Sequence, residues 1–126
     1  MTKVVILLED ERDLAHLVHE LLRDEGYMVV HVTTIEELLV EAARRSPCVA
    51  LLDSTNPRSF DLWPLGPKLV EMGVPPVAFT AHASAVAQFD EDAHGFAGII
   101  AKPFDADRLL EVINSICWEQ HEVAAS

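Results

Sequence analysis

The stretch from Val4 to Glu11, VVILLEDE, joins five apolar residues directly to three acids. A continuous apolar run of this length is typical of a strand that is buried on both faces of a parallel sheet. Three later stretches share this layout: VALLD from Val49 to Asp53, PVAFT from Pro76 to Thr80, and GIIAKP from Gly98 to Pro103. Because the strands of such a sheet end at one common edge, we predict that the polar residues after these runs lie together.

The segments between these runs have helical spacing. Leucine and valine recur at helical positions from Leu14 to Leu22, and Gly26 is suited to end that helix. Thr34 and Glu37 form a capping box for a second helix. That helix is expected to end at Ser46-Pro47, and Tyr27 to Val32 is expected to be a strand.

The second half of the chain gives weaker helical signals. Prolines and a glycine interrupt the pattern from Phe60 to Met72, so we expect a short or irregular helix there. A short helix is expected from Ala83 to His94, and Asp105 is expected to cap the last helix. Residues after Trp118 are expected to be a frayed tail. Five strands alternating with five helices predict an α/β fold, with a parallel sheet covered on both faces.

The shared edge of this sheet would carry Glu9, Asp10, Asp53, Thr80 and Lys102. A carboxylate can attack phosphorus and form an acyl phosphate. Neighbouring carboxylates repel one another unless a cation neutralises them, and Mg²⁺ is a hard cation that prefers such oxygen ligands. An ammonium and a hydroxyl can bind phosphoryl oxygens. The set therefore predicts phosphoryl chemistry with a divalent ion.

The ordered set Glu9-Asp10, Asp53, Thr80-Ala81 and Lys102-Pro103-Phe104 resembles the receiver (CheY-like) domain of bacterial two-component response regulators, from Lys3 to about Cys117. The resemblance implies a flavodoxin-like single domain with strand order 2-1-3-4-5. It implies that Asp53 accepts a phosphoryl group and that the Lys102-Pro103 peptide bond is cis. The implied metal ligands for Mg²⁺ are Asp10, Asp53, the backbone carbonyl of Thr55 and, through water, Glu9; the implied phosphoryl-binding groups are Thr80, the Ala81 N–H and Lys102.

The same resemblance implies the partners. A sensor histidine kinase or a histidine phosphotransfer protein would donate the phosphoryl group, and a downstream protein would recognise the product. His16, His19 and Arg23 are candidates for the surface that contacts the donor. We expect a stand-alone receiver over residues 1–120 with a C-terminal tail over 121–126, and no turnover of a small substrate. A homodimer through the partner-binding face is the other assembly that the resemblance allows.

Two positions depart from the family pattern. Ile99 lies three residues before Lys102, where the family usually has a Tyr or Phe ring that moves on phosphorylation. Asn56 replaces an apolar residue in the loop after Asp53. These departures count for the alternative of a pseudo-receiver, a protein-interaction module that is not phosphorylated, whereas the intact ordered set counts against it. A second alternative, a small phosphatase, is opposed by Thr55, because such enzymes usually carry a general acid two residues after the nucleophile.

Composition limits the remaining classes of function. The chain has 126 residues, which fits one domain, and its net charge of −12 argues against direct binding to nucleic acid or anionic membranes. The start of the chain lacks a signal-peptide pattern, and no apolar stretch is long enough for a membrane span, so we expect a cytoplasmic protein. In that reducing compartment we expect Cys48 and Cys117 to be buried free thiols rather than a disulfide.

Overall fold

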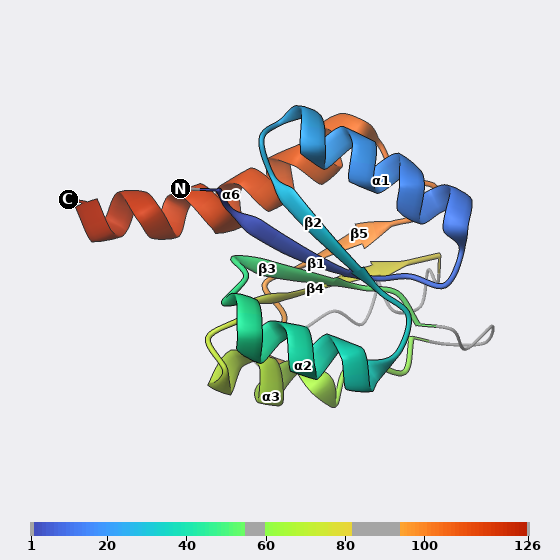
Figure 1. Ribbon diagram of the computed structural model, residues 1–126, viewed down its shortest axis with the longest axis horizontal. Helices are drawn as coiled ribbons and strands as arrows, with labels where there is room; N and C mark the ends of the chain where they lie inside the picture. Colours follow the sequence, from blue (N-terminus) through green and yellow to red (C-terminus); the bar gives the residue numbers. More distant parts are fainter. Residues whose placement is uncertain (1, 55–59, 82–93, 126) are drawn as a thin grey trace.

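A five-stranded parallel sheet forms the centre of the protein (Figure 1). The computed structural model describes residues 2–54, 60–81 and 94–125, by backbone alone beyond Trp118. The strands lie in the order β2-β1-β3-β4-β5, which confirms the order that the resemblance implied. Their bounds are β1 Val4–Leu8, β2 Met28–Val32, β3 Val49–Leu52, β4 Pro76–Thr80 and β5 Gly98–Ala101.

Helices cover both faces of the sheet (Figure 1). The described residues form four of them, α1 Arg12–Asp24, α2 Ile35–Arg45, α3 Leu65–Glu71 and α6 Ala106–Ala125. The fifth expected helix, from Ala83 to His94, falls almost wholly on residues outside the described ranges. The helix α3 has only seven residues, as the interrupted pattern predicted.

Alternate residues of each strand enter two separate cores, because successive side chains of a strand point to opposite faces. Val5 and Leu7 of β1 pack on the face covered by α1 and α6. Ile6 and Leu8 pack on the face covered by α2 and α3. The central strand β3 is completely buried, which explains its uninterrupted apolar sequence.

Local signals in the sequence fix the helix ends. The hydroxyl of Thr34 accepts a hydrogen bond from the Glu37 N–H at 3.1 Å, so the predicted cap of α2 is confirmed. The Asp105 carboxylate accepts a hydrogen bond from the Asp107 N–H at 2.9 Å, which confirms the cap of α6. Gly26 follows α1 with φ of +93°, a conformation that glycine adopts without steric cost.

The last helix is longer than expected. The helix α6 continues to Ala125, so the prediction of a frayed tail after Trp118 is wrong. Figure 1 shows its final turns extending past the end of the sheet, near the N-terminus. Two residues from the first part of the chain contact the middle of α6. The Tyr27 hydroxyl donates to Asn114, and Lys3 Nζ lies 5.2 Å from the centre of the Trp118 ring. The expected division between a domain over 1–120 and a tail over 121–126 falls inside this helix and stays a prediction.

The two cysteines are bonded to each other. Cys48, just before β3, and Cys117, on α6, form a disulfide with their Cα atoms 5.1 Å apart. The expectation of two free thiols is therefore wrong. It was argued from the redox compartment, whereas the fold brings together two residues separated by 69 positions in the sequence.

Within residues 2–54, 60–81 and 94–125, no helix combines the length and apolar character needed to cross a membrane.

Candidate functional site

The carboxyl ends of the strands carry the polar residues that the sequence analysis singled out. Glu9 and Asp10 follow β1, Asp53 follows β3, Thr80 ends β4 and Lys102 follows β5. Since β1, β3, β4 and β5 are successive neighbours in the sheet, these residues share one edge. The predicted convergence is confirmed for Glu9, Asp10, Asp53 and Lys102.

Main-chain hydrogen bonds extend the sheet one residue into the site. The Asp53 N–H donates to the Leu8 carbonyl at 2.9 Å, and the Lys102 N–H donates to the Thr80 carbonyl at 2.8 Å. The backbone at Asp53 and Lys102 is thereby held by neighbouring strands rather than by loops alone. Such attachment to rigid elements favours a precise arrangement of functional side chains.

The ammonium of Lys102 is the centre of the site. Its Nζ lies 2.9 Å from Glu9 Oε1 and 2.9 Å from Asp53 Oδ1. It also lies 4.7 Å from the centre of the Phe79 ring, which is completely buried. The lysine side chain is 15% exposed and that of Glu9 is 0% exposed, so solvent screens this ion pair weakly. One cation therefore joins the carboxylates that follow β1 and β3.

Glu9 carries the strongest electrostatic perturbation of the site. The pKa of its carboxyl is raised from 4.5 to about 7, chiefly by burial and also by the hydrogen bond and charge of Asp53, against the opposing effect of Lys102. Its second oxygen, Oε2, is buried and has no hydrogen-bond partner among the described residues. When this carboxylate is ionised, Oε1 pairs with Lys102 while Oε2 has no partner among the described residues.

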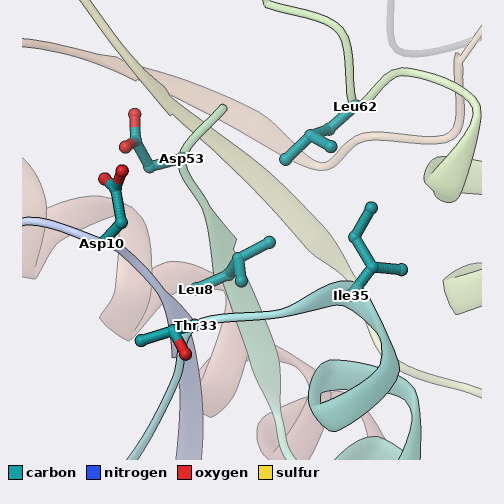
Figure 2. A pocket seen from close by; sticks show the side chains of 6 residues that line it. All are labelled: Leu8, Asp10, Thr33, Ile35, Asp53 and Leu62. Atoms are coloured by element: carbon teal, nitrogen blue, oxygen red, sulfur yellow. The ribbon is translucent and has the colours of Figure 1, made fainter. Parts of the chain in front are cut away.

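Asp10 completes a cluster of three acids. One carboxylate oxygen from each of Glu9, Asp10 and Asp53 lies within 4.8 Å of the others. Asp10 is exposed and Asp53 is half-buried, so the cluster opens to solvent on one side. Figure 2 shows their two carboxylates facing each other beside a pocket of about 210 Å³. The residues that line it are Leu8, Asp10, Thr33, Ile35, Asp53 and Leu62.

The remaining predicted residues have different outcomes. Thr80 is buried at the end of β4, and Ala81 is exposed just after it. Thr55 lies outside the described residues. The peptide bond between Lys102 and Pro103 is cis, as the resemblance implied.

Sequence reasoning missed two contacts made by residues next to the acids or by their main chain. The hydroxyl of Ser54 donates a hydrogen bond to the Asp61 carboxylate, and the Asp61 N–H donates back to Ser54 Oγ at 3.4 Å. His31 Nε2 lies 2.6 Å from the main-chain oxygen of Glu9. The position of Asp61 in the loop could have indicated a role, whereas nothing in the sequence around His31 distinguishes it from a surface residue of an edge strand.

Comparison with known proteins agrees with this geometry. The family model of the response regulator receiver domain matches residues 5–114. The nitrogen assimilation regulatory protein NtrX of Azorhizobium caulinodans is 30% identical over 126 residues, a match that covers 89% of this chain and 25% of NtrX. The chain thus spans about a quarter of the length of that relative.

Solved structures share the fold. A CheY-like response regulator receiver domain protein from Methanospirillum hungatei superposes with a TM-score of 0.82 at 24% identity, covering 97% of this chain and 98% of that one. The receiver domain of a sensor histidine kinase from Pseudomonas aeruginosa, which has a magnesium ion coordinated in its active site cleft, gives a TM-score of 0.74 at 22% identity. That match covers 93% of this chain and 98% of the other.

The family match extends over most of the chain, and the sheet order and the acid edge agree with it. The chain therefore belongs to the response regulator receiver domain family, whose members accept a phosphoryl group in two-component signalling.

Proposed function

We propose that this chain is a receiver domain in which Asp53 is the phosphoryl acceptor. The observation that carries the proposal is the bridge from Lys102 to both Glu9 and Asp53, with Asp10 alongside. A half-buried carboxylate beside a fixed ammonium has both a nucleophilic oxygen and a nearby charge that can bind the incoming group.

The acid cluster fits a divalent cation. The three carboxylates lie within 4.8 Å of one another, yet the described residues place a single ammonium among them and leave Glu9 Oε2 without a partner. Asp10 and Asp53 would hold Mg²⁺ directly and Glu9 through water, while the carbonyl of Thr55 remains a prediction outside the described residues. When bound, the ion supplies charge neutralisation to the phosphoryl oxygens.

The other steps of phosphoryl transfer fall to side chains and main-chain groups of the protein. A carboxylate oxygen of Asp53 attacks the phosphorus of a phosphohistidine, a P–O bond forms, and the P–N bond breaks as its electron pair returns to the imidazole. The Lys102 ammonium, already 2.9 Å from Asp53, then binds a phosphoryl oxygen. Thr80, the last residue of β4, and the N–H of Ala81, the residue after it, would donate two further hydrogen bonds.

The proposed donor is a sensor histidine kinase or a histidine phosphotransfer protein, since these are the donors that receiver domains use. A downstream protein target would recognise the phosphorylated form, and we propose that both encounters occur in the cytoplasm. The net charge of −12 supports a protein partner rather than direct contact with nucleic acid or an anionic membrane.

Mass spectrometry after incubation with acetyl phosphate and Mg²⁺ tests this proposal. We expect wild type to gain one phosphoryl group and Asp53→Asn to gain none. Asp13→Asn is a matched control, because Asp13 is an exposed acid in the first turn of α1 and is not a member of the acid cluster. Labelling of Asp53→Asn at the wild-type rate would contradict the proposal.

Ile99 supports a second candidate, a pseudo-receiver that binds partners without phosphorylation. The side chain of Ile99 packs against the core on the α2 and α3 face and has no ring to change position. This candidate would be favoured if wild type is not labelled and if its binding to a partner protein does not change when acetyl phosphate is added.

A further inference from the structure

A histidine on the edge strand contacts the main chain of the acid turn. His31, on β2, places Nε2 2.6 Å from the carbonyl oxygen of Glu9. A carbonyl oxygen only accepts hydrogen bonds, so Nε2 carries the hydrogen and donates it. His31 is itself exposed on the surface, and the fold does not require its side chain for core packing.

This contact occupies the main-chain acceptor of Glu9, which neither the sheet nor the lysine uses. The Glu9 N–H donates to the Val32 carbonyl at 3.2 Å, and its carboxylate pairs with Lys102 at 2.9 Å. The remaining main-chain acceptor is the carbonyl, which belongs to the peptide joining Glu9 to Asp10. The orientation of that peptide decides where the Asp10 backbone lies.

We propose that His31 is a positioning residue for the metal-binding carboxylates. By donating to the Glu9 carbonyl, it holds the peptide between Glu9 and Asp10 so that the exposed Asp10 carboxylate stays beside that of Asp53. The inference rests on the proposed function, because it concerns the same cation site. Partners of this kind, which orient the ligands of a metal without touching it, typically change metal affinity by about 10- to 100-fold when removed.

Two other histidines provide matched controls. His16 and His19, on α1, line a surface groove of about 450 Å³ together with Asp10 and His31. Among the described residues, neither makes a hydrogen bond to the turn that contains Glu9. Changing His16 therefore alters the same groove and the same residue type without removing the contact.

The test is a titration of the whole chain with Mg²⁺, in which NMR spectra monitor the amide resonance of Asp10. We expect His31→Ala to shift that resonance before any metal is added and to weaken Mg²⁺ binding by about tenfold. His31→Gln is expected to restore Mg²⁺ binding, because its side-chain amide nitrogen, a hydrogen-bond donor, is as many bonds from Cβ as Nε2 of His31. His16→Ala should bind as wild type does.

Thermal unfolding in EDTA separates positioning from general stability. We expect His31→Ala to melt close to wild type, and His31→Val, which suits a strand and lacks a donor, serves instead if the alanine variant unfolds. Three outcomes would overturn the inference. They are wild-type Mg²⁺ affinity in His31→Ala or in His31→Val, an equal loss of affinity in His16→Ala, and failure of His31→Gln to restore Mg²⁺ binding. If wild type itself binds no Mg²⁺, the proposed function fails as well, whereas the other outcomes leave it intact.

Discussion

Lys102 Nζ lies 2.9 Å from Glu9 Oε1, although 93 residues separate the two in the sequence. The contact joins the end of β1 to the end of β5, across the two strands that lie between them in the sheet. The same ammonium lies 2.9 Å from Asp53 Oδ1, so it is positioned to bind the incoming charge. This preorganisation is the basis of the first prediction.

Replacing Lys102 with alanine should slow phosphorylation by about 100-fold, the typical loss when one preorganised electrostatic group is removed. The rate of mass gain with acetyl phosphate and Mg²⁺ measures it. Lys68→Ala is the control, since Lys68 is an exposed residue of α3 outside the acid cluster. Equal rates in wild type and Lys102→Ala would show that the ammonium has no catalytic role.

The raised pKa of Glu9 should make stability depend on pH. Its carboxyl titrates at about 7 in the folded protein and near 4.5 when unfolded. Between these values the folded state keeps a proton that the unfolded state has released, so this group lowers stability as pH rises from about 4.5 to about 7. The full effect has an upper limit of about 3 kcal/mol.

Urea unfolding in EDTA tests this dependence through Glu9→Gln, which imitates the protonated form. We expect the variant to match wild type at pH 5 and to be more stable at pH 8. The reverse order at pH 8 would mean that the ion pair with Lys102 outweighs the cost of burying the charge.

Adding Mg²⁺ should raise the melting temperature of wild type, because a ligand that binds only the folded state stabilises it. Asp10→Asn should lose most of this increase, since it removes one of three clustered carboxylates. Differential scanning calorimetry in EDTA and in Mg²⁺ measures the effect, with Asp13→Asn as the control. An undiminished increase in Asp10→Asn would exclude Asp10 as a ligand.

Reducing the disulfide between Cys48 and Cys117 should lower the free energy of unfolding by about 2–4 kcal/mol, because the bond closes a long loop in the unfolded chain. Urea unfolding with and without a reductant measures this change. A double variant with alanine at both positions should show no response to reductant. Detection of two free thiols in protein prepared without reductant would contradict the bond.

The sequence predicted the elements whose signals are local. The run from Val4 to Leu8 and its counterparts identified the strands, because burial on both faces leaves no polar positions in them. Positions directly after the strands then indicated Glu9, Asp53 and Lys102, since neighbouring parallel strands bring their ends together. Thr34 and Asp105 marked helix starts through contacts within three residues.

Contacts between distant segments left no comparable signal. The bond between Cys48 and Cys117 depends on how α6 crosses the sheet, which helical spacing does not encode. The contact of His31 with Glu9 depends on the register of β2 against β1, in which His31 pairs with Leu7. The end of α6 was misjudged because the mostly polar segment after Trp118 has no apolar stripe to extend the prediction.

The covalent link and the acid cluster lie at opposite ends of β3, with Cys48 just before the strand and Asp53 just after it. The four intervening residues are wholly enclosed by the two cores, so the strand separates the disulfide from the acid cluster. We expect that breaking the disulfide loosens the packing of α6, while the carboxylates at the carboxyl end of β3 keep their spacing. Loss of the disulfide should therefore lower the stability of the fold without altering the chemistry of the acid cluster.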